Sequence, residues 1–328
     1  MKRKKMVIDW QHHLTPEPIW RARGGKPGEV LKFNQYGKMT MILYEECHDI
    51  EKQLADMDTA GIDMAVLSES PYTVEECKLV DDTYALLMKR YPDRIVGLAP
   101  CAPLLGKEAF VELERAVKDL GLKGTVISPQ RKGVYLDDKQ MWPFYEKVSK
   151  LAVPIFVHIS PAPRGFDALN APYNLNETMA REYDLATALV RVCIGGVLEE
   201  FPDLKFVFAH LGGGITAIKD RIEQYMDRFQ REFWLPEAQP AISKPFGHYF
   251  EKIYVDTAGY DGRMNALKCA LTGINPKRIL FGTDYPFDFA GNRPGMGTFI
   301  KNIRKLDLDE EAKEGILWRN AAELLGLS

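Results

Sequence analysis

The chain has 328 residues, of which 46% are hydrophobic and 27% are charged, and its formal net charge is −3. This length suits a single α/β barrel, and the composition predicts one large core with a charged exterior. The small negative charge gives no electrostatic reason to expect binding to nucleic acid or to an anionic membrane.

The sequence also bears on cellular location. Met1–Lys5 is basic, but no apolar run long enough for a signal peptide follows it. Nowhere do eighteen apolar residues follow one another, which argues against a membrane-spanning helix. The five cysteines are far apart, and none belongs to a Cys-x-x-Cys pair, so neither a disulfide framework nor a thiolate zinc site is expected. We therefore expect a cytoplasmic protein with reduced cysteines.

Short apolar runs rich in β-branched residues recur along the chain with helical stretches between them, a pattern typical of βα units and a parallel sheet. Their nearly continuous apolar character fits strands that are buried on both faces. Eight such strands predict the α/β class and a single (β/α)8 barrel of the TIM type over residues 1–328. The expected strands are Met6–Trp10, Met64–Leu67, Ile95–Ala99, Gly124–Ile127, Ile155–Val157, Phe206–Ala209, Lys252–Val255 and Ile279–Phe281.

Three of the intervening stretches carry clear helix signals. Asp49–Gly61 has apolar residues at helical spacing and a glycine at the position of a C-terminal cap. Lys107–Leu120 is followed by Gly121 in the same way. Glu182–Phe201 runs helically into Pro202, which would end it.

Three connections are longer than a barrel requires. They are Leu14–Cys47 after the first strand, Ser160–Arg181 after the fifth, and Met226–Phe250 around the helix after the sixth. Long loops in compact domains are usually lids, binding loops or interfaces. All three leave from the C-terminal ends of strands, where barrel enzymes place their active sites.

Four side chains suited to metal binding or proton transfer occur at the ends of predicted strands. His13 lies just beyond the first strand, His158 ends the fifth, His210 ends the sixth, and Asp284 follows the eighth. Each of them alone has a structural explanation, since a strand-end histidine is usually only hydrogen-bonded and Asp284 could cap a helix. Because all four fall at one rim of the barrel, they predict a common site for Zn²⁺ or Mn²⁺.

The other histidines are expected to be structural. Side chains alternate along a strand, so Gln11 and His13 share one face of the first strand while His12 points away. We therefore expect Gln11 to be the neighbour of His13, and His12 to have a supporting role. His48 and His248 fall in helical or loop surroundings.

A series of ordered motifs covers nearly the whole chain. These motifs are Val7–Pro16, Asp56–Asp63, Tyr91–Pro100, Leu120–Gly124, Val153–His158, Phe201–Gly214 and Ile279–Pro286. The series resembles the amidohydrolase-related family that includes the aminocarboxymuconate-semialdehyde and resorcylate-type decarboxylases. Such a resemblance indicates the family more strongly than it indicates the substrate.

The resemblance implies roles for the four strand-end residues. His13, His158 and Asp284 match metal ligands of the family, and His210 matches the histidine that contacts metal-bound water and moves protons. It also implies a divalent metal ion as cofactor, a small carboxylate or aromatic substrate, and a homodimer. His210 and Asp284 would then be the catalytic residues, with Asp284 also holding the metal.

The chain departs from the family pattern at two positions. Many members have a histidine or glutamate where this chain has Gln11, whose amide oxygen is a neutral and weaker ligand. We interpret Gln11 as a weak ligand or a neighbour of the ligands, and a site without metal stays open as an alternative. The resorcylate-type enzymes also place a glutamate three residues after the histidine that matches His210, where this chain has Gly213. A proton relay through that glutamate is therefore not available.

Candidate substrate contacts are less well defined. Arg221 matches an arginine that grips a substrate carboxylate across a dimer interface, but in a charged helix it could equally be a surface ion-pair residue. The resemblance implies a second arginine that binds a substrate carboxylate, and this chain has Tyr44 at its position. One of the two arginines that would hold a dicarboxylate substrate is therefore absent. Arg164, in the loop after the fifth strand, is a further candidate whose alternative is an exposed loop charge. Trp10, Trp20, Tyr285 and Phe287 could shape an apolar pocket around an aromatic ring, although Tyr285 and Phe287 could simply pack the barrel rim.

The leading functional hypothesis is non-oxidative decarboxylation of an aromatic or unsaturated carboxylic acid by a metal-dependent enzyme. A hydrolase or hydratase on the same scaffold is the main alternative, because these enzymes share their metal ligands. A non-catalytic ligand-binding barrel is the third reading, and Gln11 is the feature that favours it.

Overall fold

A computed structural model describes residues 6–28, 31–33, 41–70, 73–159, 163, 173, 175–229 and 240–327. The barrel strands are β1 (Ile8–His13), β4 (Met64–Ser68), β5 (Ile95–Gly97), β6 (Ala99–Pro100), β7 (Thr125–Ile127), β10 (Ile155–Val157), β11 (Phe206–Phe208), β12 (Tyr254–Asp256) and β13 (Ile279–Leu280). Two short hairpins are added, β2 (Leu31–Phe33) with β3 (Met41–Leu43) and β8 (Gln130–Arg131) with β9 (Val134–Tyr135).

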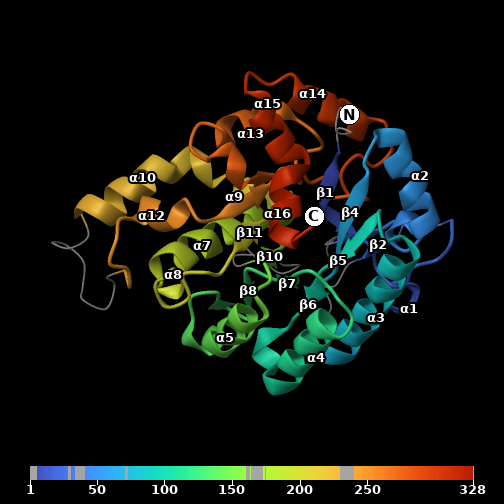
Figure 1. Cartoon of the computed structure of the whole chain (residues 1–328), viewed down its shortest axis with the longest axis horizontal. Helices are drawn as coiled ribbons and strands as arrows, with labels where there is room; N and C mark the ends of the chain where they lie inside the picture. The colour runs from blue at the N-terminus through green and yellow to red at the C-terminus, as the bar shows by residue number, and fades with distance from the viewer. Residues whose placement is uncertain are drawn as a thin grey trace.

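Helices surround these strands on the outside (Figure 1). They are α1 (Glu17–Ala22), α2 (Ile50–Ala60), α3 (Val74–Arg90), α4 (Lys107–Lys118), α5 (Trp142–Leu151), α7 (Arg181–Ile194), α8 (Val197–Glu200), α9 (His210–Gly213), α10 (Lys219–Gln224), α12 (Phe246–Phe250), α13 (Met264–Ala270), α14 (Gly295–Arg304), α15 (Glu310–Glu314) and α16 (Asn320–Leu325). None of the described helices is long and apolar enough to cross a membrane.

The strands pair in parallel in two arcs, β1-β4-β5 and β13-β12-β11-β10-β7-β6. β5 and β6 are consecutive parts of the third barrel strand, separated by Leu98, so they join the arcs on one side. On the other side, the N–H groups of Trp10 and His13 donate to the carbonyls of Phe281 and Tyr285, both at 2.8 Å. The sheet is thus closed, and the predicted (β/α)8 barrel is confirmed.

Local sequence explains where most helices begin and end. The Asp49 carboxylate caps α2 by accepting the Lys52 N–H at 3.1 Å, and Gly61 ends the helix at a φ of 77°. The predicted single helix over Glu182–Phe201 is wrong, because α7 and α8 are separated by Gly195 and Gly196. A Cβ at Gly195 would lie 2.4 Å from the Cβ of Asp137, so close packing explains the break.

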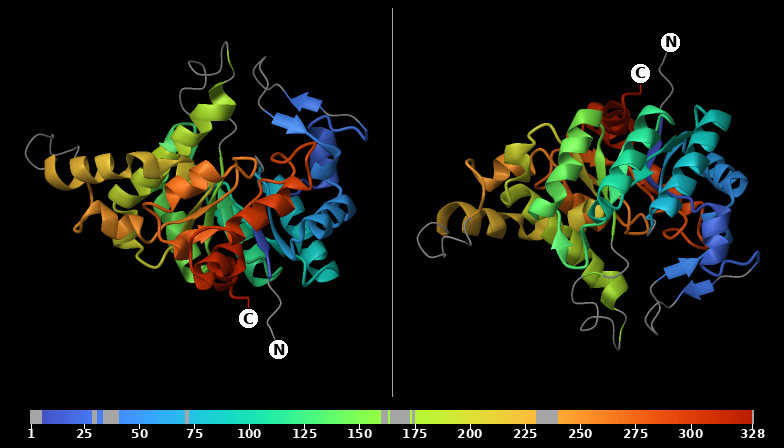
Figure 2. Two further views of the ribbon diagram at one scale, coloured as in Figure 1. Left: turned by 90° about the horizontal axis from the view of Figure 1, so that it is seen from above. Right: turned by 90° about the horizontal axis from the view of Figure 1, so that it is seen from below.

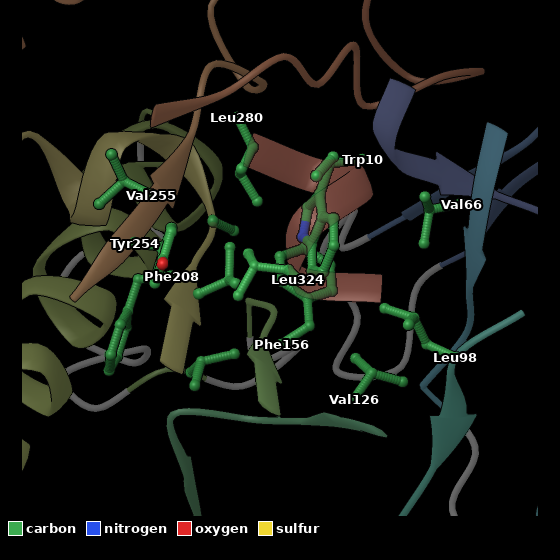
Figure 3. Packing of buried hydrophobic residues seen from close by; sticks show 14 of the residues in the cluster. Trp10, Val66, Leu98, Val126, Phe156, Phe208, Tyr254, Val255, Leu280 and Leu324 are labelled. Atoms are coloured by element: carbon green, nitrogen blue, oxygen red, sulfur yellow. The ribbon is translucent and has the colours of Figure 1, made fainter. Parts of the chain in front are cut away.

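Large apolar side chains fill the interior of the barrel below the strand ends. Trp10 lies there with Leu98 and Phe156 (Figure 3), and its ring meets that of Phe156 edge to face at a centroid distance of 6.0 Å. Trp10 is completely buried. The suggestion that Trp10 lines a substrate pocket is therefore wrong, because its side chain packs in the core and has no surface exposed to a substrate.

The described parts of two long connections, those after the first and fifth barrel strands, emerge at one end of the barrel (Figure 2). The loop after β1 contains α1 and the β2–β3 hairpin, which projects from the face opposite the two chain termini (Figure 2). The segment that leads into α7 projects from the same face (Figure 2). Positions 230–239 of the connection after the sixth barrel strand lie outside the described residues, as does most of the connection after the fifth.

Candidate active site

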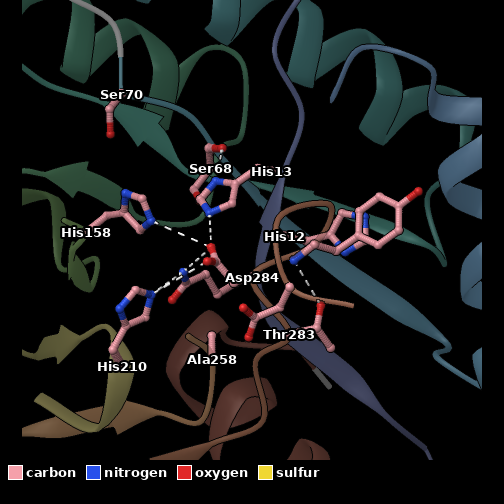
Figure 4. A network of polar contacts seen from close by, with 12 residues as sticks. His12, His13, Ser68, Ser70, His158, His210, Ala258, Thr283 and Asp284 are labelled. Carbon is pink, nitrogen blue, oxygen red and sulfur yellow. Dashed lines mark hydrogen bonds and ion pairs between the residues drawn. The ribbon is translucent and has the colours of Figure 1, made fainter. Parts of the chain in front are cut away.

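Three of the predicted ligands meet at the C-terminal rim of the barrel (Figure 4). One ligand atom each from His13, His158 and Asp284 lies within 4.8 Å of the other two. The Nε2 of His13 is 2.9 Å from the Oδ1 of Asp284, and the Nε2 of His158 is 4.0 Å from the same oxygen. Two imidazoles and one carboxylate form a donor set that suits Zn²⁺ or Mn²⁺.

His13 is oriented from behind by the neighbouring strand. Its Nδ1 lies 3.1 Å from the carbonyl oxygen of Ser68 at the end of β4, so Nδ1 carries the proton and Nε2 faces Asp284. Burial lowers the pKa of His13, but the hydrogen bond and charge of Asp284 outweigh burial, so the pKa is raised overall. A backbone carbonyl behind a histidine is a common support for a metal ligand.

His158 presents a free nitrogen to the cluster. Its backbone N–H donates to the carbonyl of Ile127 at 2.9 Å, which fixes the residue at the end of β10. The Nε2 atom is shielded from solvent and has no hydrogen-bond partner within the described part of the chain. Burial, followed by the charge of His13, holds the pKa of His158 well below its usual range. The residues thus fit a metal, because a buried neutral imidazole with a free lone pair is the form that a divalent cation binds.

Asp284 is held by the first strand of the barrel. The N–H and hydroxyl of Thr283 donate to the two carboxylate oxygens of Asp9 at 2.9 and 2.5 Å. Asp284 itself adopts a φ of +54°, a conformation that a non-glycine residue keeps only where surrounding contacts enforce it. Burial raises the pKa of Asp284, but the neighbouring histidines, His13 first, hold it below its usual range. Asp284 is therefore a carboxylate at neutral pH.

His210 lies beside this cluster in an unusual backbone conformation. Residues 210–214 all have φ between +53° and +71°, so the segment labelled α9 is a left-handed turn rather than a regular helix. Its backbone N–H donates to the Oδ1 of Asp256 at 3.0 Å, and its carbonyl accepts from the hydroxyl of Tyr260 at 2.9 Å. Gly259 has no Cβ to displace the ring, since a Cβ there would lie 2.6 Å from His210.

The two ring nitrogens of His210 face different partners. Nδ1 is 2.8 Å from the Oε1 of Glu182 on α7, and Nε2 is 3.9 Å from the Oδ2 of Asp284. Burial lowers the pKa of His210, but the carboxylates of Glu182 and Asp284 more than offset this effect and raise it to about 10. The ring is thus placed to exchange a proton with the metal-ligand cluster.

Gln11 lies between the two catalytic candidates. Its amide nitrogen donates to the Oδ1 of Asp284 at 2.7 Å and is 3.2 Å from the Nε2 of His210. The reverse amide orientation would place an oxygen against the Asp284 carboxylate, so the network fixes the nitrogen on this side. In this arrangement Gln11 supports Asp284 through a hydrogen bond, and its role as a metal ligand stays a prediction.

The remaining histidines have structural partners. His12 points away from the cluster, as expected: its Nδ1 is 2.9 Å from the Oδ2 of Asp9, and its ring stacks on Tyr285 at 4.5 Å. His48 packs on the ring of Trp20 at 4.1 Å, and His248 on that of Tyr249 at 5.1 Å.

Of the predicted substrate contacts, Tyr44 lies near the metal-ligand cluster and Tyr285 does not. The ring of Tyr44 is 6.4 Å from that of Phe287, which in turn is 5.5 Å from His13, so an aromatic wall borders the cluster. Tyr285 does not belong to this wall. It is fully buried, and its hydroxyl donates to Asp56 at 2.8 Å, so the suggestion that it lines the pocket is wrong.

Neither Arg221 nor Arg164, the predicted contacts for a substrate carboxylate, is seen beside His13, His158 and Asp284 in the described part of the chain. Arg221 is exposed on α10, which projects from the side of the barrel (Figure 1), and its guanidinium lies over the ring of Tyr225 at 4.8 Å. Arg164 lies outside the described residues.

Sequence reasoning missed two carboxylates that support the site. Asp9 was hidden in the first strand, although a charged residue inside an otherwise apolar barrel strand is itself a signal. Glu182 gave no such signal, because a glutamate at the start of a helix is common and its contact with His210 depends on tertiary packing.

The geometry is that of a barrel whose rim could hold a metal ion, and the sequence places the chain in a known family. The model of the amidohydrolase family matches residues 8–327, so the chain belongs to this family.

Individual relatives are more distant. The chain is 27% identical over 350 residues to 2-amino-3-carboxymuconate-6-semialdehyde decarboxylase of Dictyostelium discoideum, covering 99% of this chain and 92% of the relative. It is 28% identical over 293 residues to gamma-resorcylate decarboxylase of Rhizobium sp. (strain MTP-10005), covering 85% and 86%. A third relative, at 23% over 356 residues, is 2-keto-4-carboxy-3-hexenedioate hydratase of Sphingobium sp. (strain NBRC 103272 / SYK-6), covering 96% and 94%.

Solved structures share the fold. 5-Carboxyvanillate decarboxylase LigW of Sphingomonas paucimobilis superposes with a TM-score of 0.83 at 23% identity, covering 99% of this chain and all of the other. A dihydroxybenzoic acid decarboxylase of Polaromonas sp. JS666, solved with manganese and the inhibitor 2-nitroresorcinol, gives a TM-score of 0.76 at 24% identity, covering 98% and 97%. Both likenesses support the barrel assignment.

Proposed function

We propose that the protein is a metal-dependent, non-oxidative decarboxylase of an aromatic or unsaturated carboxylic acid, with residues 1–328 forming one catalytic domain. Two of the three relatives described above are decarboxylases of unsaturated or aromatic acids. The observation that carries the proposal is the convergence of His13, His158 and Asp284 within 4.8 Å, with the buried Nε2 of His158 free. Such a group has no evident structural purpose, since it leaves a buried polar atom unsatisfied.

His13, His158 and Asp284 would hold the divalent metal, with Gln11 as a weak further ligand or as the support of Asp284. Both Mn²⁺ and Zn²⁺ accept this mixture of imidazole and carboxylate. Mn²⁺ is favoured by the structurally similar decarboxylase that was solved with manganese. When bound, such an ion stabilises the negative charge that develops as CO₂ leaves.

The reaction requires a proton at the carbon that loses CO₂. The bond between that carbon and the carboxylate breaks, its electron pair stays on the carbon, and a proton must then be delivered there. His210 is the proposed general acid, because its Nε2 faces the cluster from 3.9 Å. Asp284 bridges His210 and the ligand histidines, so it is placed to pass the proton on.

The surroundings of the cluster suit a flat substrate. Tyr44 and Phe287 form an aromatic wall next to His13, and aromatic side chains favour ring-shaped ligands. Arg221 and Arg164 are proposed as contacts for a substrate carboxylate. Because Arg221 is exposed on a projecting helix, its contact would be with a substrate in a partner subunit of a homodimer.

The direct test of the proposed activity uses Mn²⁺-loaded and Zn²⁺-loaded protein with a panel of hydroxybenzoates and related unsaturated acids. We expect release of CO₂ from at least one acid, and loss of this release in His158→Ala. Absence of CO₂ from every acid with metal-replete protein would contradict the proposal. Hydration of an unsaturated keto acid without gas release would instead support the second candidate, a hydratase, which the Sphingobium relative favours.

The cytoplasm is the proposed location. All five cysteines are free, and three of them, Cys47, Cys77 and Cys193, are buried. Free thiols fit a reducing compartment. Fractionation of the source cells should recover the protein with cytoplasmic markers, and recovery in a secreted fraction would contradict this location.

A further inference from the structure

Glu182 is a half-buried carboxylate whose one hydrogen-bonding partner in the described part of the chain is His210. Its Oε1 lies 2.8 Å from the Nδ1 of His210, while its Oε2 is shielded from solvent and has no hydrogen-bond partner there. Burying a carboxylate is unfavourable unless a hydrogen bond or an opposite charge compensates. The contact with His210 is therefore what keeps this side chain in place at the start of α7.

We propose that Glu182 is a positioning residue for the reaction: it keeps a proton on the Nδ1 of His210 and thereby presents Nε2 to the metal-ligand cluster. The inference rests on the proposed function for its catalytic meaning. It assigns to α7 a role in the chemistry, although α7 contributes none of the candidate ligands.

The surroundings of the Nε2 of His210 agree with a proton held on its Nδ1. A nitrogen that is hydrogen-bonded to a carboxylate carries the proton both in the neutral and in the charged ring, so only Nε2 exchanges its proton. Gln11 donates one amide hydrogen to Asp284 at 2.7 Å, and its nitrogen is 3.2 Å from Nε2. The second amide hydrogen of Gln11 is thus available to Nε2 once this nitrogen has given up its proton, which leaves the neutral tautomer that Glu182 favours.

Gly213, three residues after His210, makes the contact between Glu182 and His210 possible. A Cβ at Gly213 would lie 2.1 Å from the carbonyl oxygen of Glu182, and Gly213 has a φ of +67°. The backbone of α7 therefore approaches the turn only because residue 213 has no side chain. A glutamate at position 213 and this position of α7 exclude each other, so the carboxylate beside the histidine comes from α7 here.

The tautomer of His210 can be measured directly. We suggest ¹⁵N-histidine NMR on the zinc-loaded chain, because Zn²⁺ is diamagnetic, with the His210 signals assigned by their loss in His210→Asn. The expected result is protonated Nδ1 in the unchanged protein and in Glu182→Gln, whose amide oxygen still accepts the hydrogen bond. In Glu182→Ala we expect Nδ1 protonation to be lost or mixed. Protonation of Nε2 alone in the unchanged protein would overturn the proposal.

Kinetics then separate positioning from folding. We expect Glu182→Ala to lower kcat by about 10- to 100-fold with little change in KM or metal content, and Glu182→Gln to recover part of the loss. The matched control is Glu200→Gln on α8, an exposed carboxylate that should leave kcat and the His210 signals unchanged. Equal kcat for Glu182→Ala and the unchanged protein would overturn the proposal.

The two proposals fail in different ways. If no acid releases CO₂ but Nδ1 protonation is present and depends on Glu182, the assignment of Glu182 as the positioning partner of His210 is supported and the decarboxylase proposal is overturned. If CO₂ is released but neither the tautomer nor kcat responds to Glu182→Ala, the role of Glu182 is overturned and the decarboxylase proposal is supported.

Discussion

The Nε2 of His158 lies 4.0 Å from the Oδ1 of Asp284, and no hydrogen bond satisfies it within the described residues. The same oxygen is only 2.9 Å from the Nε2 of His13. A cation between these three atoms would give each of them a partner, which is why removing any one should weaken binding.

Loss of a ligand should therefore remove the metal. We expect His158→Ala and Asp284→Asn to reduce bound metal after dialysis from about one ion per chain to well below half, because a site with three protein ligands loses one of them. Elemental analysis of dialysed protein measures this, with the exposed Asp93→Asn as control. Full metal retention in both variants would mean that the ion is held elsewhere.

His210 should behave differently from the ligands. His210→Asn removes the ring that faces Asp284 from 3.9 Å but leaves His13, His158 and Asp284 in place. The variant should keep its metal and lose turnover by about 10²- to 10⁴-fold, the usual contribution of a general acid. The measurements are metal content and the rate of CO₂ release on the same preparation; metal loss equal to that of His158→Ala would show that His210 is a ligand.

Gln11→Glu tests the role of residue 11. The amide nitrogen that now donates to Asp284 at 2.7 Å would be replaced by a second carboxylate oxygen, so the metal-free protein should be less stable by about 1–3 kcal/mol. A bound cation would relieve this repulsion, and the rise in Tm on adding Zn²⁺ should be larger than in the unchanged protein. Gln11→Met, which removes the donor without adding charge, is the control. A rise in Tm equal to that of the unchanged protein would place residue 11 away from the metal.

Trp10→Ala tests whether Trp10 is a core residue rather than a substrate contact. Because the Trp10 ring is fully buried inside the barrel and packs on Phe156, its loss should lower the free energy of unfolding by about 3–5 kcal/mol. Urea unfolding measures this change. If the variant is as stable as the unchanged protein but has an altered KM, Trp10 would be a substrate contact after all.

Asp81 predicts a pH dependence of stability away from the active site. Burial, followed by the neighbouring carboxylate of Glu112, raises its pKa from 3.8 to about 9. The folded chain therefore holds a proton that the unfolded chain releases near pH 4, so the stability it contributes is complete below that pH and is lost as the pH rises toward 9.

Asp81→Asn should remove this slope. Relative to the unchanged protein, the variant should gain stability between pH 5 and pH 8, by at most about 4 kcal/mol. Urea unfolding at the two pH values measures the gain, and Asp93→Asn, an exposed aspartate, should show none. A gain no larger than that of the control would mean that Asp81 is ionised in the fold.

The strand order and the four strand-end residues could be predicted because a closed parallel barrel brings the C-terminal ends of all its strands to one rim. His13, His158, His210 and Asp284 thus needed only their position after a strand to be grouped. The finer arrangement depends on packing. A register shift in β1 between Asp9 and His12 interrupts simple alternation, so Asp9 contacts His12 rather than sharing a face with Gln11 and His13.

Other features depended on contacts that the sequence does not display. Glu182 meets His210 only because Gly213 lets α7 approach the turn. Tyr285 was expected at the pocket from its place beside Asp284, but its pairing with His12 directs it toward Asp56. The break between α7 and α8 likewise follows from the packing of Gly195 on Asp137.

The central claim, a single divalent cation held by His13, His158 and Asp284, is tested most directly by a crystal of the manganese-loaded protein and an anomalous difference map recorded above the manganese edge. We predict one strong peak per chain, about 2.0–2.3 Å from the Nε2 atoms of both histidines and from a carboxylate oxygen of Asp284. A map without a peak among these three side chains, or with its main peak at other residues, would contradict the claim.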